Sequence, residues 1–182
     1  MSRTLLAGAG LAILVTACGG SMTETEYVDA LNALVETGQS DIEASAAAYG
    51  QIEEPTLAEA VAFIEREVEI RSEFREGFEA LDPPDSLAEV HRVLGDALVR
   101  LMDAAEGLVA VAGSVGSVEE AEQTPEFAEY LAANADGRLA CLDVQELLDG
   151  LVASGEAMAD AAWIPEVGLA VRAVLGCGEI AD

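Results

Sequence analysis

The segment LDPPDSLAEVHRVLGDALVRLMDAAEGLVAVA, residues 81–112, decides the fold. Its two prolines end the preceding helix, because proline lacks the backbone donor and restricts the residue before it. A new helix is expected to start near Asp85 or Ser86, with Glu89 three residues after Ser86 as in a capping box. Its apolar residues alternate steps of four and three, which predicts the heptad seam of a helix bundle. The seam comprises Leu87, His91, Leu94, Leu98, Leu101, Ala105, Leu108 and Ala112.

Two helices are predicted before this segment. Ser21 and Thr23 are each followed three residues later by glutamate, which is the capping-box pattern, and Thr56 shows it again. Apolar residues recur at helical spacing after each cap, and residues 50–55 separate the two helices. The turn at Pro83-Pro84 is short, so the second and third helices should form an antiparallel hairpin.

Further helices are predicted toward the C-terminus. Residues 118–123 are ambiguous between a helical turn and a loop, whereas Thr124 before Pro125 indicates a helix start. A short helix is expected to end near Gly137, a second to follow it, and residues 167–175 to form the last one. The expected fold class is all-α, a bundle of about five to six helices.

The chain of 182 residues is strongly acidic, with 35 acidic and 8 basic residues and a net charge of −27. Such a charge favours solubility and repels polyanions, so nucleic-acid binding is disfavoured. Enzyme signatures such as a nucleophile elbow, a zinc-protease helix or a P-loop are absent from the sequence, which has a single histidine. These features favour a protein that is not an enzyme.

The first residues have the pattern of an export signal. A short charged start precedes an apolar run at residues 5–15, which is too short to span a membrane. The alternative, an uncleaved amphipathic or transmembrane start, is disfavoured by Gly8, Gly10 and the short apolar core. Val15-Thr16-Ala17-Cys18 resembles a bacterial lipobox, in which a branched residue and two small residues precede a cysteine that is lipidated.

This resemblance implies a domain plan and a location. Residues 1–17 would be a cleaved signal peptide, residues 18–25 the lipidated Cys18 with a short tether, and residues 26–182 a single helical domain. Two or more acyl chains hold a protein stably on a membrane, so the protein would be extracytoplasmic and lipid-anchored. The mature part loosely resembles small helical lipoproteins of high-GC bacteria, and that resemblance implies no known activity.

Two cysteines remain in the mature part, Cys141 and Cys177. Cysteine pairs outside the cytoplasm usually form disulfides, so a Cys141–Cys177 bond is expected. The alternatives are two buried thiols or a metal site. A metal site would need more ligands, and no histidine lies near either cysteine in the sequence.

Charged residues interrupt the apolar face of the second predicted helix. Glu67 and Arg71 lie one helical turn apart within the apolar arc of the second helix, and Arg75 lies at its edge. Folding back at the Pro-Pro turn brings His91 near the level of Phe78 and Arg75. A pocket for a small anion is therefore one hypothesis. The alternative is structural: arginine stems lie along apolar surface, and a Glu–Arg pair commonly stabilises a fold.

Other ligands have less support. Haem would require His91 opposite Met102 or Met158, and the sequence has no CxxCH motif. Its abundant carboxylates do not follow a calcium-loop pattern, so no cofactor or dedicated metal site is expected. The leading functional hypothesis is a non-catalytic binding or interaction module of the cell envelope with an unknown protein or small-molecule partner. A solute- or cation-binding lipoprotein with a pocket inside the bundle is second, and an envelope hydrolase is third.

Overall fold

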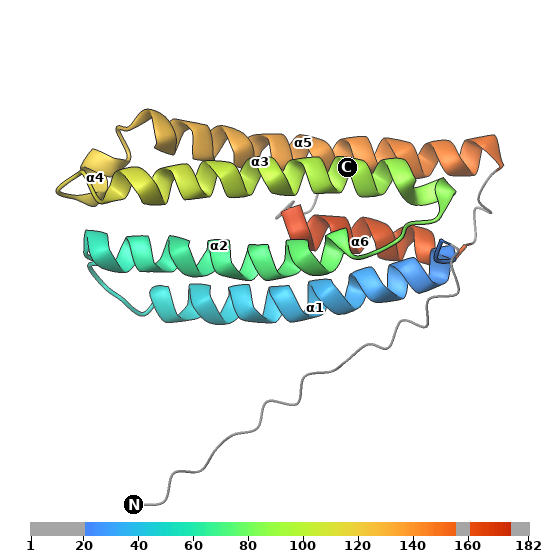
Figure 1. The fold of residues 1–182 in the computed structure, drawn as a ribbon, viewed down its shortest axis with the longest axis horizontal. Helices are drawn as coiled ribbons and strands as arrows, with labels where there is room; N and C mark the ends of the chain where they lie inside the picture. Colours follow the sequence, from blue (N-terminus) through green and yellow to red (C-terminus); the bar gives the residue numbers. More distant parts are fainter. Residues whose placement is uncertain (1–20, 156–160, 176–182) are drawn as a thin grey trace, which may run out of the picture.

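The computed structural model describes residues 21–155 and 161–175. The lipobox with Cys18, and also Met158 and Cys177, lie outside the described residues. The described residues contain helices joined by turns, which confirms the all-α prediction (Figure 1). The elements are α1 (Glu24–Tyr49), α2 (Leu57–Glu79), η1 (Asp85–Leu87), α3 (Ala88–Ala112), α4 (Val118–Ala121), α5 (Pro125–Ser154) and α6 (Trp163–Leu175).

The predicted capping boxes of α1 and α2 are confirmed. Thr23 accepts a hydrogen bond from the backbone of Glu26, and the Glu26 carboxylate accepts one from the backbone of Thr23. Thr56 and Glu59 repeat this arrangement at the start of α2. The hydrogen bonds from the threonines lower the pKa of both glutamates. Both helices therefore begin where their sequences predict.

The third helix begins differently from its prediction. The Pro-Pro turn leads into the 3-10 turn η1, and α3 follows from Ala88. Ser86 does not cap the helix with Glu89, because its hydroxyl donates instead to Glu24 of α1, at 2.8 Å. The seven seam residues other than His91 are buried, and α2 packs against α3, which confirms the hairpin (Figure 1).

The predicted helix end near Gly137 was wrong. α5 is one continuous helix of 30 residues, and Gly137 is buried in its middle. A Cβ on Gly137 would lie 3.8 Å from the carbonyl oxygen of Leu175 at the end of α6, which is an ordinary contact distance, so α5 passes close to the end of α6 at this point. Residues 118–121 form a helical turn, and the last helix starts at Trp163, earlier than predicted.

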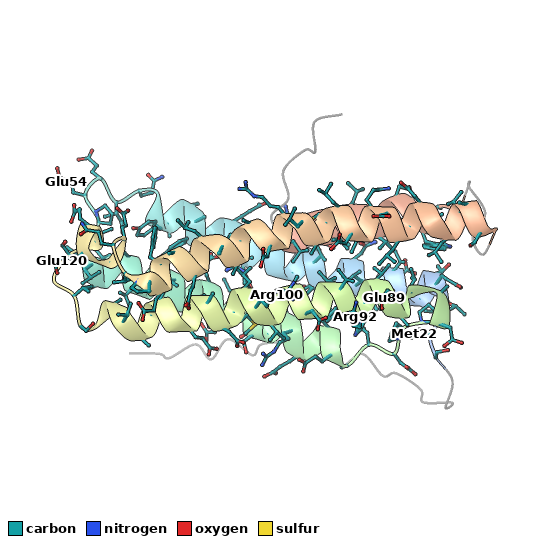
Figure 2. All side chains as sticks on the ribbon, turned by 90° about the horizontal axis from the view of Figure 1, so that it is seen from above. Met22, Glu54, Glu89, Arg92, Arg100 and Glu120 are labelled. Atoms are coloured by element: carbon teal, nitrogen blue, oxygen red, sulfur yellow. The ribbon has the colours of Figure 1, made fainter. Side chains whose placement is uncertain are left out.

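The long helices and α6 form a ring in which α1 packs on α2, α2 on α3, α3 on α5, α5 on α6, and α6 on α1. α6 has 13 residues against 26 in α1, so it closes this ring along part of the bundle only (Figure 1). We call the part beside α6 and Met22 the proximal half. The distal half is the opposite end, which carries residues 39–65 and 101–137, with Glu54 and Glu120 at its tip (Figure 2).

The main hydrophobic core lies in the proximal half. On α1 the buried side chains are Tyr27, Val28 and Leu31. On α3 the main cluster stops at Leu98, and α6 contributes its buried apolar face. The packing there is tight, because a Cβ on Gly77 of α2 would lie 2.6 Å from the Leu34 side chain of α1. None of the described helices is long and apolar enough to span a bilayer.

Candidate functional site

Glu67 and Arg71 form the predicted ion pair on α2. Arg71 donates to the Glu67 carboxylate at 2.8 Å, and Glu67 is buried with 8% of its surface exposed. The second carboxylate oxygen of Glu67 and Nε of Arg71 are buried without a hydrogen-bond partner in the structure. The pair is thus only partly satisfied, and removal of one member would leave the other charge with little solvation.

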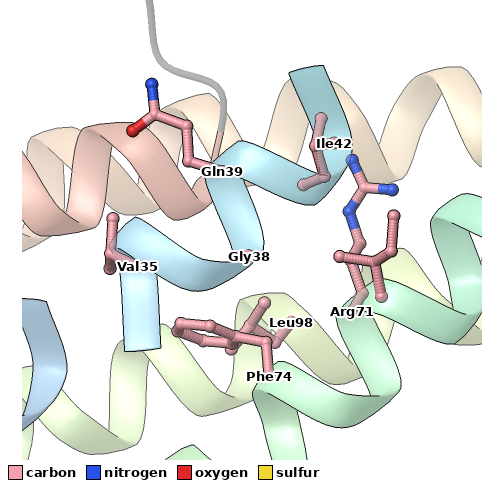
Figure 3. Close-up of a pocket in the computed structure, with 8 residues that line it drawn as sticks. Val35, Gly38, Gln39, Ile42, Arg71, Phe74 and Leu98 are labelled. Atoms are coloured by element: carbon pink, nitrogen blue, oxygen red, sulfur yellow. The ribbon is translucent and has the colours of Figure 1, made fainter. Parts of the chain in front are cut away.

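A small cavity of about 60 Å³ lies beside Arg71, between α1 and α2. Figure 3 shows Phe74 and Leu98 on one side of Gly38 of α1, with the Arg71 side chain extending past Ile42. The lining is mostly apolar, and the volume is well below the roughly 300–1,000 Å³ of typical small-molecule pockets. It has room for a few water molecules rather than for a solute of metabolite size.

His91 occupies a different environment. Its Nδ1 lies 3.1 Å from the hydroxyl oxygen of Tyr27, and its ring stacks on Phe78 with centroids 4.0 Å apart. Burial lowers the pKa of His91, so the imidazole is held in its neutral form. Burial also raises the pKa of the Tyr27 hydroxyl. The three rings thus join α1, α2 and α3 in the proximal half.

The four predicted pocket residues therefore separate into distinct groups. Glu67 pairs with Arg71 near the small cavity, and His91 packs with Tyr27 and Phe78. Nε of Arg75 lies 3.5 Å from the Glu79 carboxylate and is buried without a hydrogen bond. The predicted level of His91 beside Phe78 is confirmed. The structure does not gather the four side chains around one cavity.

The metal and haem alternatives gain no geometric support. Within residues 21–155 and 161–175, no group of three or more His, Cys, Asp or Glu side chains is arranged to hold a metal ion. Met102 is on the same helix as His91, about three turns away, so the two side chains cannot face one haem from opposite sides. Cys141 is buried on α5, and the predicted bond to Cys177 stays a prediction.

A larger apolar cleft of about 230 Å³ lies in the distal half. The end of α1, the start of α2, the end of α3, α4 and the start of α5 all contribute to it. Buried apolar side chains of α3 and α4 line it together with half-buried aromatic and aliphatic side chains. We call this space the distal cleft. The residues that line it are Tyr49, Leu57, Ala60, Val61, Phe63, Ile64, Leu108, Ala112, Val118, Ala121, Glu122, Phe127 and Tyr130.

Aromatic residues are concentrated in the distal cleft. The chain has one Trp, three Tyr and four Phe, and half of these eight residues line this one cleft. The rings of Tyr49 and Phe63 stack with centroids 4.5 Å apart and planes at 15°. Phe127 and Tyr130 come from the first turns of α5, whose start is fixed by the Thr124 cap and Pro125.

The charge around the distal cleft is predominantly negative, although Arg66 interacts with Asp41 at its edge. Residues 39–65 contain six carboxylates and residues 101–137 contain eight, and these two segments contain no Arg, Lys or His. Glu122 lines the cleft and is exposed. Figure 2 shows Glu54 and Glu120 at this tip, while the labelled arginines lie farther along the bundle. The cleft therefore combines apolar walls with a negative surrounding potential.

Sequence reasoning did not identify the distal cleft. Tyr49, Phe127 and Tyr130 have the spacing of helical apolar residues, and that spacing alone does not distinguish a cleft from a filled core. A usable signal was present, because Tyr49 and Phe63 flank the break at 50–55, and Phe127 and Tyr130 begin the first helix of normal length after the break at 113–116. Antiparallel hairpins bring such breaks to the same end of a bundle.

Comparisons with other proteins do not identify a family. None of the known protein-family models matches this chain, and no characterised protein or solved structure is significantly similar to it.

Proposed function

We propose that this protein is a lipid-anchored binding protein of the cell envelope, with its binding site in the distal cleft and no catalytic role. The observation that carries the proposal is the distal cleft itself, an open apolar space of about 230 Å³. Two larger grooves between α3 and α5, of about 590 and 300 Å³, are more open and are lined largely by charged side chains, Arg92 and Asp143 among them. The Arg71 cavity is a weaker candidate, because its volume is about 60 Å³. Concave, mainly apolar sites are where small molecules usually bind.

The lipobox and the fold together suit this role. Cys18 precedes α1 by six residues, which can span at most about 20 Å. α1 then extends for 26 residues, or about 40 Å, toward the distal cleft. A lipid on Cys18 would thus attach at the proximal end, and the cleft would face away from the attachment point.

The predicted disulfide also suits an extracytoplasmic protein. The last residue of α6, Leu175, lies close to Gly137, one helical turn from Cys141 on α5. This places the chain two residues before Cys177 beside the helix that carries its proposed partner. A bond at this point would hold α6 in the ring and stabilise the fold by about 3–4 kcal/mol in the chain-entropy model.

The anchoring is tested in a bacterium that processes lipoproteins, by metabolic labelling with an alkyne-bearing palmitate and by membrane fractionation. The full chain should incorporate the label and sediment with membranes, whereas Cys18→Ala should do neither. Cys141→Ala serves as a matched control that removes a different cysteine. An unlabelled wild-type chain that stays in the soluble fraction would contradict the lipid anchor.

A further inference from the structure

We propose that the distal cleft selects hydrophobic cations, namely protonated or quaternary amines that carry an apolar group. This inference rests on the proposed function and specifies the ligand of the same site. It combines two independent features of the cleft, its aromatic walls and the charge of its surroundings. Each feature supplies one half of the recognition.

The aromatic walls supply the apolar contact and a preference for positive charge. Tyr49 and Phe63 present a stacked pair from α1 and α2, and Phe127 and Tyr130 approach from α5. The face of an aromatic ring is electron-rich and attracts a cation that lies within about 6 Å of its centre. Quaternary ammonium groups are recognised in this way by clusters of aromatic side chains.

The surrounding carboxylates make the electrostatic potential at the cleft negative. Glu122 lines the cleft, and the two segments that form the distal half carry fourteen carboxylates, against the single guanidinium of Arg66 beside Asp41. An anion would be repelled by this potential, and a neutral apolar molecule would gain nothing from it. A bare metal ion would find apolar side chains in place of a coordinating group.

The size of the cleft limits the ligand. A volume of about 230 Å³ is slightly below the range of typical drug-sized pockets, so it suits a single ring or short alkyl group with an ammonium head. Most residues that line the cleft are only half-buried, so the ammonium head of the ligand would stay near water. Its charge then need not be fully desolvated. The ammonium head would then lie near Glu122, with the apolar group against the rings.

The test compares three probes of similar size: phenyltrimethylammonium, its neutral isostere tert-butylbenzene, and the anion benzenesulfonate. Each is titrated by ligand-observed NMR against the full chain in phosphatidylcholine nanodiscs, with empty nanodiscs as the blank. We expect saturable one-to-one binding of the cation, at least about tenfold weaker binding of the neutral isostere, and no binding of the anion.

Two substitutions locate the binding. Glu122→Gln removes one exposed charge, and we expect about fivefold weaker cation binding with no change for the neutral probe. Tyr130→Leu removes one ring with a similar apolar volume and should weaken cation binding about fivefold. Glu36→Gln is the matched control, because it changes the net charge equally at an exposed site in the proximal half.

Each result has one meaning. Cation binding that is reduced by Glu122→Gln and Tyr130→Leu, but not by Glu36→Gln, supports the proposal. Equal affinity for the cation and its neutral isostere overturns the cation preference and leaves the distal cleft as an apolar binding site. Cation binding that neither cleft substitution changes places the site elsewhere and overturns the proposal. An absence of binding by all three probes overturns it too, while the palmitate labelling still decides the lipid anchor independently.

Discussion

The proximal and distal halves of the bundle share the same four long helices but differ in how those helices are covered. In the proximal half, α6 closes the ring, and Tyr27, Phe78 and His91 join three helices through stacking and a hydrogen bond. In the distal half of the described structure the ring has no such closing helix, and half-buried aromatic side chains line a cleft. The proximal half holds the main core, with exposed leucines only on its outer surface, at Leu139, Leu142 and Leu169, whereas the distal half has an apolar cleft between its helices.

This difference is consistent with separate roles for the two halves, stability of the fold in the proximal half and ligand binding in the distal half. Ligand sites need apolar surface that the protein does not fill itself, and that surface contributes little to folding until a ligand covers it. A closed core elsewhere can carry the stability of the whole domain. Substitutions in the two halves should therefore have unequal effects on the free energy of unfolding and on binding.

The largest effect is expected from truncation of the proximal core. Leu94 is fully buried, so Leu94→Ala should lower the free energy of unfolding by about 2–5 kcal/mol. Ile64 lines the distal cleft and is half-buried, so Ile64→Ala should cost only about 1 kcal/mol. Urea unfolding followed by circular dichroism measures both. Equal losses at the two positions would remove the distinction between the halves.

The next effect concerns the buried ion pair near the boundary between the halves. Arg71→Ala leaves the buried Glu67 carboxylate without its partner, and we expect a loss of about 3 kcal/mol in the free energy of unfolding. Replacement of both charges, in Glu67→Leu with Arg71→Met, should be close to neutral, because no buried charge is left unpaired. A double variant that is as unstable as Arg71→Ala would show that the pair itself holds the helices together.

The helix caps allow a smaller and more local comparison. Thr23→Ala and Thr56→Ala each remove a side-chain acceptor from a capping box, and each should cost about 1 kcal/mol. Thr56 lies at the distal end, so its substitution should also increase hydrogen exchange at the start of α2. Thr23→Ala should leave exchange at that end unchanged. Increased exchange at the distal end in both variants would mean that the halves unfold together.

The smallest effect is a pH dependence of the proximal half. Burial lowers the pKa of His91 from its ordinary value of 6.5, so the unfolded chain binds the proton more readily than the folded one. The stability that comes from neutral His91 is present above pH 6.5 and is lost as the pH falls below it. The His91→Phe variant retains a ring beside Phe78 and lacks this titration. The stability of wild type relative to the variant should therefore fall as the pH is lowered from 7.5 to 5.5, and a pH-independent difference would contradict the assignment.

The sequence predicted the starts of α1 and α2, the hairpin and the seam of α3 in both halves, because local signals determine them. The capping threonines, the Pro-Pro turn and the heptad seam act within a few residues, and each appears in the structure as expected. The predictions failed at positions where contacts with another helix accompany a different local structure. α5 continues through Gly137, which is buried beside the end of α6, and the Ser86 hydroxyl donates to Glu24 in place of capping α3. No local rule reveals such partners.

The candidate site was the harder part to predict. Helical periodicity placed Glu67 and Arg71 together correctly, since residues four apart share a face. Periodicity could not predict that His91 lies apart from Glu67 and Arg71, because that placement depends on its contact with Tyr27 of α1. The distal cleft requires five chain segments to meet at one end, and an apolar residue beside a cleft has the same spacing as one in a filled core.

The most direct test of this account is hydrogen exchange measured by mass spectrometry on the full chain in nanodiscs, with and without phenyltrimethylammonium. We predict that peptides from the end of α1, the start of α2 and the start of α5 exchange faster than proximal peptides of the same helices. The cation should slow exchange in these distal peptides alone. Uniform protection along each helix, or slowing confined to the proximal half, would contradict the division into a closed core and an open binding end.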